Sequence, residues 1–188
     1  MITIVLVLIA AAPFALYFWH EHKVSTPSLQ WPVLAKLLNM TCEDDPPRMH
    51  GNWNGRRVAF EAAPAGATVT VWLNAATRLR VECGPIERVT RRAGIVLPDP
   101  VEPLDKTFRD KLRARCSEKA AGPTVFDVAL QQRLAALPAV DFIGQGAKVT
   151  WTVPAVKDID SVEALLGALC AVADGLESFP QGGTAPRA

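Results

Sequence analysis

Histidine and tyrosine are scarce in this chain, and the familiar catalytic motifs are missing. The 188 residues include three histidines and one tyrosine, and only His50 lies beyond the first 23 residues. No G-x-S-x-G, P-loop or H-E-x-x-H motif occurs, and residues 144–146 (Gly-Gln-Gly) do not extend to a dinucleotide fingerprint. Because acid–base chemistry near neutral pH relies most often on histidine, the sequence predicts a protein that is not an enzyme.

The four cysteines lack the spacing of a metal or redox motif, since no C-x-x-C pair occurs. Two disulfides are possible in an oxidising compartment, but a chain of this length does not need them, so we expect reduced thiols. A Cys42–His50 nucleophile has no third orienting residue. The densest set of metal-ligand side chains lacks the spacing of a calcium loop, so we expect no metal and no cofactor. That set is Cys42, Glu43, Asp44, Asp45 and His50.

Charge of one sign is not in excess. The chain has 20 basic and 19 acidic residues, a net charge of +1, which gives no bulk reason to bind nucleic acid. Residues 76–119 are net basic and residues 120–188 net acidic. This asymmetry could orient a domain on an anionic membrane or a partner, although an ordinary solvated surface is the favoured explanation.

The one long stretch without any charged residue is Ile2 to Trp19. As a helix rising ~1.5 Å per residue it would reach about 27 Å, close to a hydrocarbon core of ~30 Å. Aromatic residues end the run and polar residues follow it, as at a membrane interface. The sequence therefore predicts an anchor over residues 1–23 of a single-pass inner-membrane protein. The expected interface residues are Tyr17, Phe18, Trp19, His20, His22 and Lys23.

A cleaved signal peptide is the competing reading of the N-terminus, because residues 10–12 (Ala-Ala-Ala) offer a cleavage site. Against it, no Lys or Arg precedes the run, and the apolar residues continue to Trp19. The nearest positive charges all follow the run. The positive-inside tendency thus favours a cytoplasmic domain, with a periplasmic domain left open.

Periodicity predicts an α+β fold, an antiparallel sheet covered by helices, over residues 29–179. Residues 24–28 are expected to form a tether, and residues 180–188 a flexible tail. Helices are expected from Pro32 to about residue 40, over 124–137 with Thr124 as cap, and from Asp160 onward. The segment 42–47 is expected to be a loop.

Alternating apolar residues predict the strands. Residues 49–83 indicate a four-stranded antiparallel meander that includes strands 68–73 and 79–83, and residues 140–153 indicate a second hairpin. A Pro-rich connector is expected over 84–103, and a short helical turn followed by a strand over 104–117.

A docking element is expected at the first hairpin, where residues 54–55 (Asn-Gly) give the type I′ turn signature. Trp53, Arg56 and Arg57 flank this turn, and tryptophan and arginine are enriched at interface hot spots. These three residues are the candidate partner contact. The alternative is that Trp53 folds back onto the sheet.

In layout, with one N-terminal span, an aromatic belt and a strand-rich domain, the chain resembles accessory subunits of bacterial energy-transducing complexes, such as the H subunit of purple-bacterial reaction centres. The resemblance implies a non-catalytic subunit that contacts the bilayer and other membrane-protein subunits, possibly photosynthetic ones. The second hypothesis is an envelope-facing tethered module that binds a lipid, peptide or glycan. A small thiol enzyme is the third.

Overall fold

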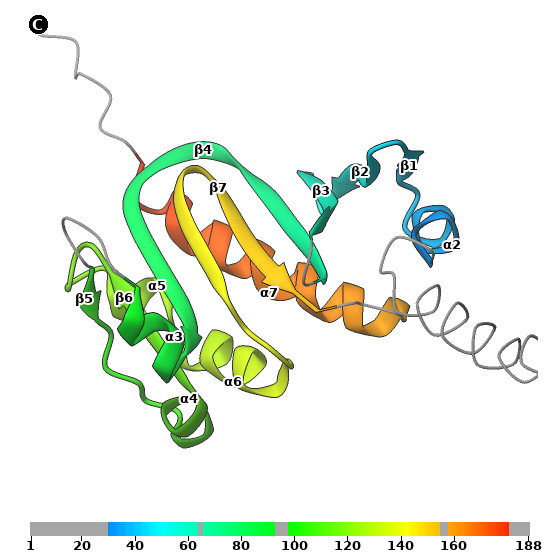
Figure 1. Cartoon of the computed structure of the whole chain (residues 1–188). Helices are drawn as coiled ribbons and strands as arrows, with labels where there is room; N and C mark the ends of the chain where they lie inside the picture. The colour runs from blue at the N-terminus through cyan, green and yellow to red at the C-terminus, as the bar shows by residue number, and fades with distance from the viewer. Residues whose placement is uncertain (1–29, 64–65, 93–97, 155–157, 181–188) are drawn as a thin grey trace, which may run out of the picture.

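The computed structural model describes residues 30–63, 66–92, 98–154 and 158–180. These residues form an α+β domain with an antiparallel sheet and helices, as the sequence predicts (Figure 1). The expected interface residues, from Tyr17 to Lys23, lie outside the described ranges. Within those ranges, no helix is both long and apolar enough to cross a bilayer.

Thirteen helices and strands occupy the described part of the chain. They are α2 (Trp31–Leu37), β1 (Thr41–Asp44), β2 (Pro47–Trp53), β3 (Arg56–Ala63), β4 (Gly66–Pro85), α3 (Ile86–Arg91), β5 (Asp99–Pro100), α4 (Lys106–Lys111), β6 (Leu112–Cys116), α5 (Gly122–Val125), α6 (Val128–Ala136), β7 (Phe142–Val153) and α7 (Ile159–Glu177).

The sheet is organised around two long bent strands, β4 and β7, which run antiparallel along their whole length (Figure 1). The pairing shifts register on both sides of Thr77, and β7 turns at Gly146, whose φ is 59°. On the other edge of β4, strand β3 pairs with the first arm and β6 with the second. Bulges of this kind bend a strand sharply.

This bend corrects two predictions. The expected strands 68–73 and 79–83 are the two arms of β4 and do not pair with each other. The expected second hairpin over 140–153 is the single bent strand β7. Alternation of apolar residues is the same in a bent strand as in two separate strands, so the sequence pattern could not distinguish them.

The two ends of β7 come together at the open end of the bend. The Thr152 N–H donates to the Asp141 carbonyl at 3.1 Å, and the Trp151 indole Nε1 donates to the Ala139 carbonyl at 3.2 Å. The two arms of the bent strand β7 therefore lie side by side.

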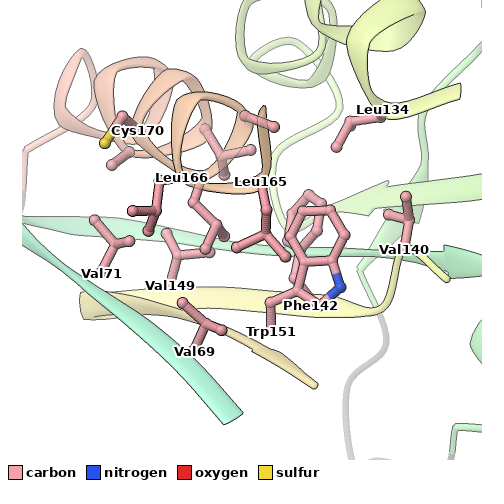
Figure 2. Close-up of a cluster of buried hydrophobic side chains, with 14 of the residues drawn as sticks. Val69, Val71, Leu134, Val140, Phe142, Val149, Trp151, Leu165, Leu166 and Cys170 are labelled. Atoms are coloured by element: carbon pink, nitrogen blue, oxygen red, sulfur yellow. The ribbon is translucent and has the colours of Figure 1, made fainter. Parts of the chain in front are cut away.

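Helix α7 covers the inner face of the two bent strands, β4 and β7 (Figure 2). Val71, Val149 and Trp151 point from the strands toward Leu165 and Leu166 of the helix, and all five are buried. Burying each such side chain contributes about 1.5–3 kcal/mol. The predicted apolar stripe of this helix is confirmed. Its buried members include Val162, Leu165, Leu166, Leu169, Val172, Ala173 and Leu176.

Capping decides where two helices begin. The Asp158 carboxylate accepts from the Ser161 N–H at 2.8 Å, so Asp158 is the N-cap of α7. The cap therefore lies two residues before the predicted cap, Asp160. The predicted helix 124–137 is divided, because Asp127 adopts an extended conformation and accepts from the Leu130 N–H at 2.7 Å. An extended N-cap residue cannot continue a preceding helix.

Other segments differ from or agree with their predictions. The expected loop over 42–47 instead contains most of β1 and the start of β2, which pair with each other. The expected connector over 84–103 contains the helix α3 and the short β5. The expected turn and strand over 104–117 are confirmed as α4 and β6.

Candidate functional site

The predicted hairpin at Asn54-Gly55 is present, with both turn residues at positive φ (48° and 75°). Trp53 is half-buried and packs against the core. The exposed Arg57 guanidinium lies 4.6 Å from the centre of the Trp72 ring. Arginine over tryptophan is a favourable cation–π contact, so part of the Arg57 side chain is engaged within the chain.

Arg56 does not point outward, which corrects its place in the predicted docking element. Only 5% of the surface of Arg56 is exposed to solvent. Nη1 donates to Glu177 Oε1 at 2.5 Å, and Nη2 donates to Glu177 Oε2 at 2.7 Å and to Asp174 Oδ1 at 2.5 Å. A guanidinium occupied by two carboxylates of its own chain has little left for a partner. Docking through Trp53 and Arg57 remains a prediction.

Glu177 also accepts from the Asn74 N–H at 2.5 Å, at the bend of β4. The hydrogen bonds from Arg56 hold the pKa of the Glu177 carboxyl below its ordinary value. Arg56, Asp174 and Glu177, which we term the clasp, thus join the first hairpin, the bend of β4 and the end of α7.

The proposed thiol–histidine pair is not formed. Cys42 lies opposite Met49, whereas His50 lies opposite Thr41, so Cys42 and His50 point to opposite faces of the sheet. Burial raises the pKa of the Cys42 thiol, and the carboxylates of Asp44 and Glu43 raise it further. A thiol with a raised pKa is a poor nucleophile. Among the described residues, no three His, Cys, Asp or Glu side chains are placed to hold a metal ion.

A better candidate site is a groove of about 340 Å³ at the far end of the sheet, where β5 leaves β6. This volume falls at the small end of known ligand sites, which are mostly apolar with a few convergent polar groups. Its lining fits that description, with seven apolar residues. The lining residues are Ile86, Pro100, Val101, Glu102, Pro103, Phe108, Arg109, Leu112, Arg113 and Ala114, termed here the α4 groove.

A buried amide holds the backbone that follows Pro103, one of the residues that line the α4 groove. Gln131 of α6 is 1% exposed, and its Oε1 accepts from the backbone N–H groups of Leu104 (2.9 Å) and Asp105 (3.0 Å). Its Nε2 donates to the Phe126 carbonyl at 2.8 Å. The side chain of Leu104, whose backbone is held in this way, is 71% exposed.

The cap of α4 places the floor and the rim of the groove. The Asp105 carboxylate accepts from the Phe108 N–H at 2.8 Å and starts the helix there. Phe108 is then buried at 1% exposure, and the next residue, Arg109, is exposed. Arg113 follows on β6 and is also exposed. Within the described ranges, no carboxylate lies within 4.0 Å of the Arg113 guanidinium.

Ion pairs fix helix α3, which brings Ile86 to the groove. Glu82 is fully buried, and its Oε1 accepts from Arg80 Nη2 at 2.7 Å. Asp141 accepts from Arg88 at 2.9 Å and also from Arg92, which lies just beyond the end of α3. Arg92 also lies 3.8 Å from Glu82 Oε2 on β4. Arg88 and Arg92 therefore join α3 and the residue that follows it to β4 and to Asp141, which directly precedes β7.

Sequence reasoning missed the α4 groove because its lining comes from several elements, one of them inside the segment read as a connector. A usable signal was present in the sequence. Leu104, Phe108 and Leu112 have helical spacing, yet the structure ends the helix at Lys111 and leaves Leu104 outside it.

Comparison with known proteins supports the fold. No family model matches the sequence, and no curated protein matches it. A solved structure that does match is the crystal structure of the mycobacterial trehalose monomycolate transport factor A, TtfA. The TM-score is 0.65 at 9% identity, over 84% of this chain and 98% of that chain. At this identity the similarity concerns the fold.

Proposed function

We propose that this chain is a membrane-tethered, non-catalytic module that binds an acyl-chain amphiphile of the cell envelope in the α4 groove. The observation that carries the proposal is the groove itself, a mostly apolar hollow whose lining includes two exposed arginines, Arg109 and Arg113, and one exposed glutamate, Glu102. Such a site matches a molecule with an apolar chain and a head group that accepts hydrogen bonds.

Two further observations support this reading over the photosynthetic accessory subunit. The neighbour with the same fold is named for the transport of trehalose monomycolate, an acylated sugar. The uncharged run from Ile2 to Trp19 would hold the domain next to the membrane in which such amphiphiles are found.

In this account the protein works by holding its ligand. Phe108 and Leu112 take up the acyl chain and exclude water, while Arg109 and Arg113 donate to the head group. The Gln131 amide holds the backbone between Pro103 and Phe108, both of which line the groove. None of these steps makes or breaks a covalent bond.

The test is to purify the full chain from the membranes of cells that produce it, using a mild detergent, and to identify the bound lipids by mass spectrometry. The matched pair of variants is Arg109→Glu/Arg113→Glu and Lys119→Glu/Lys148→Glu. The two double variants change the net charge of the chain by the same amount, and all four substituted residues are exposed.

We expect one acylated species to be enriched over bulk membrane lipid in the wild type and the lysine variant, and to be lost from the arginine variant. A lipid profile equal to that of the bulk membrane in all three proteins would contradict lipid binding. If other membrane subunits were recovered in stoichiometric amounts without an enriched lipid, the accessory-subunit hypothesis would be favoured.

A further inference from the structure

Helix α2 is apolar on two opposite sides. One side, formed by Trp31, Leu34 and Leu38, is buried. There the Trp31 ring meets the Phe60 ring edge-on, with centroids 6.4 Å apart. This contact fixes the helix to the sheet and leaves the other side turned outward.

The outward side carries Val33 and Leu37, one helical turn apart and each 62% exposed. In the described part of the chain, four large apolar side chains are exposed, and these are two of them. The other two, Leu104 and Val128, lie on different segments. Two exposed apolar residues on one helix of seven residues form a patch that its own domain does not cover.

The position of α2 in the chain indicates what covers this patch. The uncharged run that predicts a membrane span ends at Trp19, and α2 begins at Trp31. The eleven residues between them reach at most about 40 Å when fully extended. A run that spans a bilayer therefore keeps the patch within that distance of the membrane surface.

The charge on α2 is also consistent with contact to a bilayer surface. Lys36 is the one charged residue of α2, and it is exposed beside Leu37. A lysine next to exposed apolar residues is typical of helices that lie in a membrane interface. Their apolar side chains enter the acyl boundary and their ammonium groups stay at the phosphates.

We propose that the outward side of α2 lies on the bilayer surface, with Val33 and Leu37 in the interface and Lys36 at the lipid phosphates. This inference rests on the membrane tether of the proposed function. It also gives the domain an orientation. Helices α2 and α4 lie at opposite ends of the domain, so the contact fixes which end of the domain meets the bilayer (Figure 1).

The experiment uses the full chain reconstituted into vesicles that contain an anionic phospholipid. Cys42→Ser removes the half-buried thiol, and the other three cysteines are buried. The cysteine introduced by Leu37→Cys is then the exposed thiol that carries an environment-sensitive fluorophore. The matched control is Val128→Cys on α6, which is also exposed and apolar in the wild type.

We expect the label at position 37, and not the label at 128, to shift its emission to the blue and to be quenched severalfold more by spin-labelled lipids. If the protein floats with the vesicles but both labels behave as in water, the inference is wrong and the tether stands. A shift at 37 without lipid quenching would mean that a protein covers the patch, which also overturns it. If the protein does not float with the vesicles, the tether itself fails.

Discussion

The Arg56 guanidinium and the Glu177 carboxylate face each other across two hydrogen bonds, of 2.5 Å and 2.7 Å, although 121 positions separate them in the chain. The pair fixes the bend of β4, because Glu177 also accepts from the Asn74 N–H at that bend. The end of α7 is held at the same place by Thr77, whose Oγ1 donates to the Phe179 carbonyl at 2.9 Å.

Replacement of Arg56 tests how much the clasp stabilises the fold. Arg56→Met leaves the Glu177 carboxylate without its main partner, and the side chain of Glu177 is only 19% exposed. We expect the free energy of unfolding to fall by about 2–3 kcal/mol, less than for a fully buried pair. Urea unfolding followed by circular dichroism measures this change.

The control for that variant is Arg78→Met. Arg78 pairs with Glu118 at 2.9 Å, but both side chains are about half exposed. Exposed pairs contribute about 0–1 kcal/mol, so this variant should unfold close to the wild type. Equal losses for the two variants would mean that the clasp is no more than a surface ion pair.

The clasp also predicts how stability depends on pH. The pKa of Glu177 is lowered from 4.5 by its hydrogen bonds to Arg56, so the unfolded chain takes up this proton at a higher pH than the folded chain does. The stabilisation is complete above pH 4.5 and is lost as the pH falls through the folded-state pKa. Unfolding in urea between pH 7 and pH 3 should therefore show a steeper loss below pH 4.5 for the wild type than for Arg56→Met. Parallel curves would contradict this.

Gly144 is required where α7 crosses β7. A Cβ at this position would lie 2.7 Å from Leu176 Cδ1 and 2.9 Å from Val81 Cγ2. Gly144→Ala should therefore destabilise the domain by about 1–3 kcal/mol through overpacking. Gly167, inside α7, has nothing within 4 Å of such a Cβ, so Gly167→Ala should stabilise it by about 0.5–1 kcal/mol. Thermal unfolding of both variants shows whether each substitution raises or lowers the stability of the domain. A stabilising effect of Gly144→Ala would rule out a tight crossing of α7 and β7.

The Gln131→Met variant tests whether a single buried amide holds the backbone next to the α4 groove. Gln131→Met keeps the shape of the side chain but leaves the Leu104 and Asp105 N–H groups without their acceptor. We expect a loss of about 1–3 kcal/mol in unfolding free energy. Faster hydrogen exchange should be confined to residues 103–108. Unchanged exchange there would show that this backbone does not depend on Gln131.

Local patterns in the sequence predicted much of the secondary structure. The Asn54-Gly55 turn requires two positive φ angles, and few residue pairs supply them, so this hairpin could be predicted. The apolar stripe of α7 was equally clear because its period persists over nineteen residues.

Features set by distant contacts could not be predicted in the same way. Arg56 looks like an exposed arginine beside a turn, and only the arrival of α7 more than a hundred residues later buries it. The bend of β4 depends on Glu177 and Phe179 for the same reason. The groove combines α3, α4 and β6, whose proximity is set by the sheet order and not by any motif.

The most direct test of the account is to map where an acyl chain binds. The full chain is reconstituted into vesicles containing a fatty acid with a photo-activated diazirine group, irradiated and digested, and the modified residues are located by mass spectrometry. The account predicts adducts within residues 86–114, at Phe108 or Leu112. They should be lost in Arg109→Glu/Arg113→Glu and kept in Lys119→Glu/Lys148→Glu. Adducts confined to residues 2–19, with none between 86 and 114, would contradict it.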